Sequence, residues 1–425
     1  MFDRSAPAVI FKPGRFPLHH GTLGIIRSLG SAGVPVYAVL EDSLVPAGLS
    51  RYLTGRVVWT PDENSDDQLL AGLAMIADRI GRPAVLIPTS DHAAIFFDDH
   101  AAELTPWGLF PQPKPGLIRA LADKQELHRI CRSVGLDCPQ SFFPKSAEEA
   151  GALVGQVEFP VLVKITEPWR RPRPAGLAST AIVRNAGELI ALYRLADAAP
   201  DVQLMVQEYV PSTSNTDDMF AAYCDAESRC LVSLTGEKLR SYPADAGMTS
   251  ASRSTDNEEL RVLLERFLAR IGYRGIVDLE LRRDLRDGRY KLLDFNPRVG
   301  AQFRLYRSGA GIDVVQAMHL HLTGREVPQA AAFKRRSFVV ENYELAVLWS
   351  YRRKHKLRMR DWIATLTGER ELAWFSRHDK LPFLMMCVRM AYTMLRNRLL
   401  PAKARSRSGG PTFHAGRGAS LLSAG

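Results

Sequence analysis

The sequence predicts a mixed α/β fold, α+β in part, that ends in a basic helical extension. In roughly the first 115 residues short apolar strands alternate with helices, which is typical of a parallel α/β unit. Later segments indicate an antiparallel hairpin, which accounts for the α+β part. With 425 residues, of which 46% are hydrophobic, the chain has enough apolar content for several cores. We therefore expect more than one domain.

The N-terminal unit is predicted to be Rossmann-like. Strands are expected at 8–11, 34–40 and 84–88, and helices at 24–33 and 67–81. Small molecules bind where the strands of such a unit end. Residues 14–21 and 89–92 follow two of these strands, but they lack the G-x-G-x-x-G fingerprint, so NAD is not expected. Arg27 and Ser90-Asp91 are candidate substrate contacts, with a helix cap or a surface position as the alternative.

Two lysines in the next part of the chain stand at the ends of predicted elements. Lys124 follows Asp123 at the start of a predicted helix. Lys164 ends the apolar run 159–163, which indicates a buried strand. A cation at such a strand end needs an anion, and a nucleotide phosphate would supply one. Ordinary surface exposure is the alternative for both lysines.

Two further strands carry polar groups. The strand 205–210 is apolar up to Gln207 and Glu208, and a surface turn is the alternative interpretation of that acid. Lys238 and Arg240 stand two residues apart in a strand, so they are predicted to share one face. They would then face a phosphate together, unless both are solvated.

The segment 292–298 is the most informative stretch. Asp294, Asn296 and, approximately, Arg298 share one face of a strand, and Glu280 lies on the strand before it. Oxygen ligands that leave positions for water and phosphate suit Mg²⁺. The alternative is an exposed hairpin whose acids pair with neighbouring arginines.

The register of this hairpin decides whether the two acids share a site. A two-residue turn at Asp287-Gly288 would place Glu280 opposite Phe295 and separate it from Asp294. We therefore predict a loop of three or five residues with Gly288 at positive φ, and Glu280 directly opposite Asp294.

In this order the motifs resemble the ATP-grasp superfamily. Glu280 followed by Asp294-Phe295-Asn296-Pro297-Arg298 is similar to its metal-binding signature, although the superfamily usually has Glu where this chain has Asp294. The helix start at Lys124 with 134–139, the lysine strand 159–164, and the strands 205–210 and 236–243 are similar to further superfamily motifs. Within the superfamily, 236–243, 25–29 and 86–91 resemble D-aspartate ligase-like carboxylate-amine ligases.

The resemblance implies an ATP-dependent ligase that joins a small-molecule carboxylate to an amine through an acyl phosphate and releases ADP and phosphate. Mg²⁺ would be the metal, with Mn²⁺ as an alternative. The implied metal ligands are Glu280, Asp294 and Asn296. The implied nucleotide-binding residues are Lys124, Lys164, Gln207, Glu208 and Val210, and the residues that would stabilise the transferring phosphoryl group are Lys238, Arg240 and Arg298.

The same resemblance implies the domain bounds. We expect an N-terminal pre-ATP-grasp domain over 1–118 and an ATP-grasp domain over 119–328, with two subdomains and a hinge near 207–211. A basic helical extension is expected over 329–405, followed by a disordered tail over 406–425.

An arginine- and proline-rich loop follows the lysine strand. Residues 166–176 contain one glycine, whereas ATP-grasp enzymes usually cover the triphosphate with a glycine-rich loop. We interpret Arg170, Arg171 and Arg173 as a charged lid that contacts phosphates through its side chains, with a stiff exposed loop as the alternative.

Most of the positive charge lies in the C-terminal extension. Residues 331–425 hold 19 Lys/Arg against 6 Asp/Glu, and 352–360 is the densest basic run. The apolar segment 381–395 is interrupted by Arg389 and is too short and too charged for a transmembrane span. Residues 381–405 are instead expected on an anionic membrane surface or docked on the core. Nucleic acid is an unlikely partner because no binding module is evident.

The sequence also bears on the cellular location of the protein and on alternative functions. The N-terminus lacks a secretory signal and the five cysteines lack metal-binding spacing, so we expect a cytoplasmic protein, with peripheral contact at the inner face of the membrane as an option. An ATP-grasp phosphotransferase and a non-catalytic membrane-associated ATP-binding protein stay open. The sequence does not identify the carboxylate, the amine or the oligomeric state.

Overall fold

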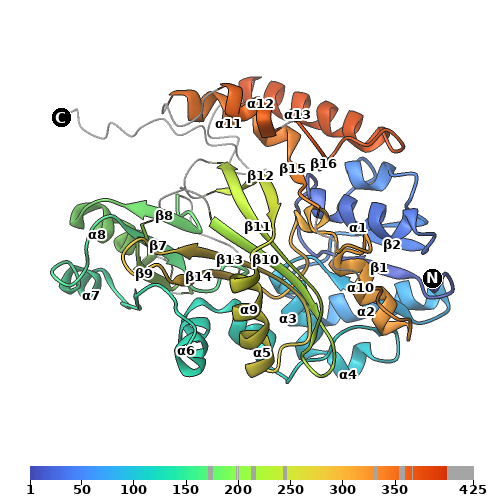
Figure 1. Cartoon of the computed structure of the whole chain (residues 1–425), viewed down its shortest axis with the longest axis horizontal. Helices are drawn as coiled ribbons and strands as arrows, with labels where there is room; N and C mark the ends of the chain where they lie inside the picture. Colours follow the sequence, from blue (N-terminus) through green and yellow to red (C-terminus); the bar gives the residue numbers. More distant parts are fainter. Residues whose placement is uncertain are drawn as a thin grey trace.

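The structure, a computed structural model, describes residues 1–170, 176–197, 199, 201–211, 217–242, 247–329, 334–353, 359–365 and 367–399. Figure 1 shows the N-terminal α/β unit in blue at the right, a small green lobe at the left and a large sheet between them. The predicted tail 406–425 and residues Arg171 and Arg173 of the loop lie outside the described residues.

The N-terminal sheet has five parallel strands in the order β3-β2-β1-β4-β5. They are β1 (Ala8–Phe11), β2 (Val36–Leu40), β3 (Gly55–Val58), β4 (Ala84–Pro88) and β5 (Gly108–Leu109). The helical elements are α1 (His20–Ser31), η1 (Pro46–Leu49), α2 (Asp66–Ile80), α3 (Asp91–Asp99) and α4 (Ala101–Leu104). The predicted alternation is confirmed. Helix α1 begins four residues earlier than predicted because the side chain of His19 caps it, accepting from the backbone N–H of Thr22.

Two helices connect this unit to the small lobe. They are α5 (Leu117–Ala122) and α6 (Lys124–Val134). The carboxylate of Asp123 caps α6 by accepting from the N–H groups of Gln125 and Glu126, both at 2.8 Å. The cap fixes Lys124 at the first helical position, as the sequence predicted.

The small lobe is a four-stranded antiparallel sheet in the order β6-β9-β7-β8. Its strands are β6 (Ser141–Phe142), β7 (Val161–Ile165), β8 (Thr180–Val183) and β9 (Leu204–Glu208), and its helices are α7 (Ala147–Ala152) and α8 (Ala186–Asp197). Val161, Val163 and Ile165 alternate into the core of this lobe, so Lys164 projects from the opposite face of β7.

The central sheet has seven strands in the order β14-β13-β10-β11-β12-β15-β16. The strands are β10 (Asp217–Cys224), β11 (Cys230–Tyr242), β12 (Met248–Thr255), β13 (Gly275–Arg283), β14 (Tyr290–Asn296), β15 (Ser337–Val339) and β16 (Arg370–Leu372). The associated helical elements are α9 (Glu258–Arg270), η2 (Phe303–Leu305) and α10 (Val314–Leu322). Helix α9 packs on one face of the sheet, whereas α10 and α1 share a core with the other.

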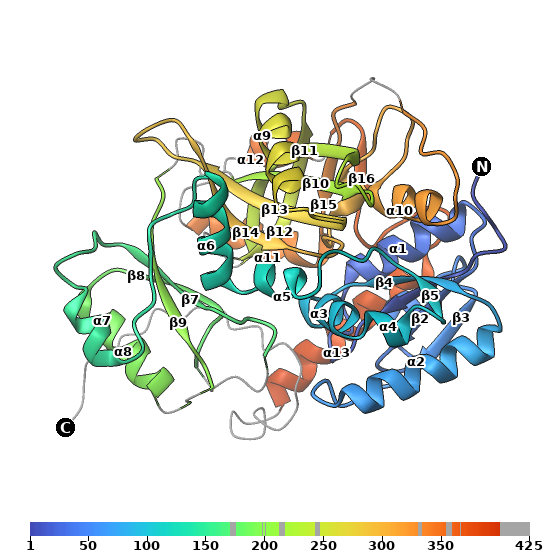
Figure 2. The same cartoon turned by 90° about the horizontal axis from the view of Figure 1, so that it is seen from below.

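The C-terminal extension is only partly helical. It contains α11 (Glu341–Arg353), α12 (Met359–Thr365) and α13 (Leu381–Leu399), but it also adds β15 and β16 to the central sheet. In Figure 1 the three helices form an orange and red layer along the top of the molecule. Figure 2 shows the end of α13 beside the N-terminal unit. The extension is therefore continuous with the core of the protein.

Candidate active site

The β13–β14 hairpin sets two carboxylates opposite each other. Glu280 pairs with Asp294, which confirms the predicted register. Gly288 has a φ of +73°, also as predicted. The predicted odd loop length is wrong, because the last pair, Arg283 with Tyr290, encloses six residues.

A β-bulge reconciles this even loop with the observed pairing. Leu281 pairs with Leu292 while Glu280 pairs with Asp294, so Leu293 is an extra residue on β14. The bulge also frees the backbone carbonyl of Leu293, which accepts a hydrogen bond from Nζ of Lys164 at 3.1 Å. One irregularity thus aligns the acids and orients a lysine from the other lobe.

Lysines from different parts of the chain neutralise the two acids. Lys124 of α6 pairs with Asp294, and Lys238 of β11 pairs with Glu280. Burial opposes ionisation of Asp294, but Lys124 and Lys164 together outweigh it and hold the pKa of this carboxyl at about 2. Burial lowers the pKa of Lys164 to about 8, although Asp294 partly opposes the shift.

A third acid on the same face was missed by the sequence analysis. Asp278 is 7% exposed and stands opposite Asn296 in the hairpin. Burial raises its pKa to about 7. Gly300 packs against it so closely that a Cβ there would lie 2.5 Å from the carboxyl carbon. Its position two residues before Glu280 was the available signal, because alternate strand residues share a face.

Arg298 and Asn296 complete this end of the site. Nη2 of Arg298 donates to Oδ1 of Asn296 at 2.8 Å, and Nε donates to Oδ1 of Asp91 at 3.1 Å. Asp91 begins α3 of the N-terminal unit, so the predicted arginine joins two domains at the site. Ser90 caps α3 by accepting from the N–H of Ala93, which is the capping alternative considered for it.

The oxygen atoms of the site could supply some, but not all, of the ligands of a magnesium ion. Among the described residues, no three His, Cys, Asp or Glu side chains form a ready metal cluster. Mg²⁺, however, needs only one or two carboxylates when substrate phosphates and water supply its other ligands. Glu280 and Asp294, with the amide of Asn296, match that requirement, and nucleotide binding would compete with their lysine partners.

The prediction that Arg240 shares a face with Lys238 is wrong. Lys238 pairs with Ser252 but Arg240 pairs with Ala251, so Leu239 is an extra residue that turns Arg240 to the other face of the sheet. There its guanidinium pairs with Glu344 of α11 at 2.9 Å, with both side chains buried. Arg240 therefore anchors the C-terminal extension.

The predicted hinge residues lie at the end of β9. Val210 is buried, and its carbonyl accepts from Nη1 of Arg282 at 3.2 Å. Nε2 of Gln207 donates to the hydroxyl of Ser141 at 3.3 Å. The structure thus places Gln207, Glu208 and Val210 where the small lobe meets the central sheet.

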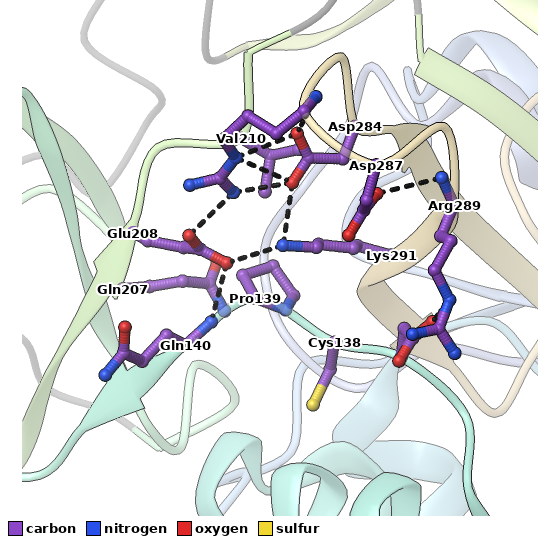
Figure 3. Close-up of polar contacts among 12 residues, drawn as sticks. Cys138, Pro139, Gln140, Gln207, Glu208, Val210, Asp284, Asp287, Arg289 and Lys291 are labelled. Carbon is purple, nitrogen blue, oxygen red and sulfur yellow. Dashed lines mark hydrogen bonds and ion pairs between the residues drawn. The ribbon is translucent and has the colours of Figure 1, made fainter.

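The side chain of Glu208 links the two lobes, which the sequence did not predict. Figure 3 shows its carboxylate accepting from the N–H of Gln140 and Nζ of Lys291. The guanidinium of Arg286 also donates to it. The distances are 2.9, 3.0 and 2.7 Å. Asp284 holds the same two cations from the other side. Burial would raise the pKa of Glu208, but these donors together lower it.

The arginine-rich loop borders a large cavity between the small lobe and the N-terminal unit. The cavity measures about 620 Å³, and Glu167, Arg170, His92 and Arg119 contribute to its lining. Arg170 pairs with Glu167 at 2.9 Å. The role of Arg170, Arg171 and Arg173 as a charged lid over the phosphates remains a prediction.

Arg27 does not contact a substrate site. It is 3% exposed, its Nε pairs with Asp379 at 2.9 Å, and its other donors bind backbone carbonyls of the extension. Its role is structural, because it ties α1 to the segment before α13.

Comparison with known proteins agrees with this architecture. No family model matches the sequence. The structure is similar to an ADP complex of N5-carboxyaminoimidazole ribonucleotide synthetase, with a TM-score of 0.61, 12% identity, and coverage of 83% of this chain and 86% of that one. The chain has the ATP-grasp fold.

Two ligases are also similar to this chain. The sequence is 23% identical over 290 residues to a D-aspartate ligase of Enterococcus faecium, covering 65% of this chain and 68% of that ligase. The structure resembles an L-amino acid ligase of Bacillus licheniformis, with a TM-score of 0.55, 15% identity and coverage of 75% of each chain. The superfamily resemblance seen in the sequence is thus confirmed.

Proposed function

We propose that this protein is an ATP-dependent ligase that joins a carboxylate to an amine through an acyl phosphate, releasing ADP and phosphate. The observation that carries the proposal is the Glu280–Asp294 pair with Lys124, Lys164 and Lys238 around it, in a chain similar to a D-aspartate ligase. Opposed acids and convergent lysines suit a polyanionic substrate with a divalent metal.

The residues of the site would have different roles in catalysis. Glu280, Asp294 and Asn296 would hold Mg²⁺, which neutralises charge on the β- and γ-phosphates. Lys124 and Lys164 would bind phosphate oxygens, while Lys238 and Arg298 would stabilise charge on the phosphoryl group during transfer. The hinge at Gln207, Glu208 and Val210 would hold the adenine through its backbone. We propose the domain bounds 1–118, 119–328 and 329–405 on the same basis.

A substrate panel tests the reaction class. The purified protein is given Mg-ATP with each of a series of carboxylates, with and without amines, and ADP is measured. Turnover that needs both a carboxylate and an amine supports the ligase. Turnover that leaves a stable phosphorylated acid without any amine supports a phosphotransferase instead. Tight ATP binding without turnover on any pair supports a non-catalytic ATP-binding protein.

We further propose that α13 contacts an anionic membrane surface. No helix in the described part of the chain is long and apolar enough to span a bilayer. The outer face of α13 nevertheless carries an apolar stripe at helical spacing, formed by Leu381, Leu384, Val388, Tyr392 and Leu395, each at least 55% exposed. The helix contains no Asp or Glu. Arg377 and Lys380, both exposed, precede it. This pattern suits interfacial binding.

Vesicle pelleting tests the contact. Leu384→Glu with Val388→Glu should reduce pelleting with phosphatidylserine-containing vesicles, because it places charge on the stripe. Met75→Glu is the control, since Met75 is 67% exposed on α2 of the N-terminal unit. Equal pelleting of the stripe variant, the control and the wild type would remove the membrane proposal.

A further inference from the structure

We propose that Cys138 is a peroxide-reactive thiol that is oxidised to a disulfide with Cys131, next to the proposed hinge between the small lobe and the central sheet. The oxidant would be hydrogen peroxide or an organic hydroperoxide. The reaction concerns these two thiols alone, so it can be measured whether or not the protein is a ligase.

The sulfur of Cys138 lies against two side chains on one face of α6. Nδ1 of His128 is 3.2 Å from Sγ of Cys138, and the Cys131 thiol hydrogen-bonds to the same sulfur. His128 and Cys131 are three residues apart, so they are neighbours on the helix surface. The chain turns back at Gly135, which has a φ of +72°, and the N–H of Leu136 then donates to the Cys131 carbonyl at 2.9 Å. The fold therefore holds a thiol, an imidazole and a second thiol together.

These neighbours favour the thiolate form of Cys138, which is the form that attacks a peroxide. The hydrogen bond from Cys131 lowers the pKa of Cys138 most, and His128 and Arg132 lower it further, although burial opposes the shift. Cys138 is half-buried, so a small oxidant has access to it. Cys131 is 0% exposed, and the same hydrogen bond and its burial raise its pKa. An accessible thiolate beside a second cysteine is typical of redox-sensitive sites.

The oxidation proceeds in two balanced steps. The Cys138 thiolate attacks one oxygen of the peroxide, so an S–O bond forms, the O–O bond breaks, and the departing hydroxide takes up a proton to become water. The Cys131 thiol then attacks the resulting sulfenic acid, so the S–S bond forms, the S–O bond breaks, and the hydroxide leaves as water with the proton of that thiol. Two thiols are oxidised, and one hydrogen peroxide is reduced to two water molecules.

A second pair of cysteines provides a contrast within the same chain. Sγ of Cys224 and Sγ of Cys230 are 3.1 Å apart at directly opposed positions of β10 and β11. The hydrogen bond with Cys230 and burial raise the pKa of Cys224, and Asp225 and Glu265 raise it further. Proximity is common to both pairs, but the carboxylates here oppose the thiolate that the imidazole favours at Cys138. We therefore expect Cys138 to react first.

The segment that carries Cys138 is attached to the central sheet and to the small lobe. The carbonyl of Asp137 accepts from the N–H of Leu292 on β14 at 2.9 Å, and the N–H of Gln140 donates to Glu208 of β9 at 2.9 Å. Figure 3 shows the Cys138 sulfur directed away from the ion pairs around Glu208. A disulfide brings its two sulfurs to about 2.05 Å, much closer than a hydrogen bond does, so its formation shifts this segment between its two attachments. Oxidation should therefore weaken nucleotide binding at the hinge, a consequence that rests on the proposed function.

Peptide mapping tests the reactivity. The reduced wild-type protein is treated with hydrogen peroxide at neutral pH, and its remaining thiols are alkylated before digestion. Trypsin cleaves after Arg132, between the two cysteines, so a disulfide joins two peptides. Cys138 should react about tenfold faster than the exposed Cys387, because an ordinary thiol is only slightly ionised at neutral pH. Reaction of Cys138 no faster than that of Cys387, or a Cys224–Cys230 disulfide that forms first, would overturn the inference.

Three variants separate the steps. Cys131→Ser removes the second thiol, so Cys138 should stop at the sulfenic acid, which dimedone traps as an adduct. Cys138→Ser should leave Cys131 reduced throughout, and oxidation of Cys131 in this variant would contradict the assignment. His128→Gln should slow the reaction of Cys138 severalfold. Its control is His100→Gln, because His100 pairs with Asp66 in the N-terminal unit. Equal rates in His128→Gln and the control would remove the role of the imidazole.

Nucleotide affinity tests the link to the hinge. The Kd for Mg-ATP is measured calorimetrically for the wild type before oxidation, after it, and after reduction with dithiothreitol. It should rise about fivefold or more on oxidation and return on reduction, while Cys138→Ser is unaffected by the same treatment. A disulfide that leaves the Kd unchanged would overturn the link to the hinge. Oxidation of the two cysteines in a protein that binds no ATP would uphold the thiol site and remove the proposed nucleotide function.

Discussion

At the scale of single residues, the site is a balanced set of charges. Asp294 and Glu280 are each paired with a lysine, while the one hydrogen-bond partner of Lys164 among the described residues is the carbonyl of Leu293. Because burial lowers its pKa to about 8, Lys164 loses its charge as the pH rises through a range just above neutral.

ATP affinity should therefore weaken above pH 8. The charged form of Lys164 is present below its pKa and is lost as pH rises through about 8, and a neutral amine no longer attracts phosphate. We expect the Kd for Mg-ATP to rise between pH 7.5 and 9 in the wild type. Lys164→Met should bind weakly throughout and lose this dependence. A wild-type Kd that stays flat across the range would contradict the role of Lys164.

The sequence predicted most of these residues but not all of their positions. Lys164 was found because it ends a recognisable apolar strand, and Lys124 because it opens a predicted helix. Glu280, Asp294 and Lys238 were found because their strands resemble superfamily motifs. Asp278 was overlooked, although strand periodicity placed it on the face of Glu280. Arg27 was misinterpreted because its partner, Asp379, lies 352 residues away and no local pattern could predict the pair.

At the scale of elements, two β-bulges decide which residues meet. Leu293 brings Asp294 opposite Glu280 despite an even loop, and Leu239 turns Arg240 away from Lys238. Assigning side chains to the two faces of a strand by simple alternation fails at a bulge. One extra residue moves every later side chain of that strand to the opposite face. Neither bulge contains a glycine that would have indicated it.

Glu208 joins the end of β9 to the β13–β14 hairpin at the proposed hinge. Glu208→Gln should raise KM for ATP by up to about tenfold, because it weakens charged hydrogen bonds to Lys291 and Arg286 that would fix the proposed adenine-binding hinge. Glu258→Gln is the control, since Glu258 pairs with Arg261 on the surface of α9. An unchanged KM in Glu208→Gln would show that the hinge is held by its backbone alone.

At the scale of the whole molecule, the C-terminal extension binds both the central sheet and the N-terminal unit. Asp379 is 3% exposed and accepts from Arg27, the Ser50 hydroxyl and the Arg51 backbone. Part of the expected helical extension therefore forms strands at the edge of the central sheet. Another part packs against the N-terminal unit through Asp379. Both contacts depend on residues that are far apart in the sequence.

Removing this anchor should destabilise the protein. Asp379→Ala leaves Arg27 buried without its counter-charge, so we expect a loss of about 3–5 kcal/mol in the free energy of unfolding. Asp42→Ala breaks the more exposed pair with Arg389, 2.8 Å long, and should cost about 1 kcal/mol or less. Urea denaturation measures both. Similar losses in the two variants would contradict the anchoring role of Asp379.

The central claim, activation of a carboxylate as an acyl phosphate, is tested most directly with oxygen isotopes. An accepted acid labelled with ¹⁸O in its carboxylate is incubated with Mg-ATP and its amine, and the released phosphate is examined by mass spectrometry. Transfer through an acyl phosphate predicts one ¹⁸O atom in each phosphate, and no phosphate release by Asp294→Ala. Unlabelled phosphate from the wild type would contradict the proposed reaction.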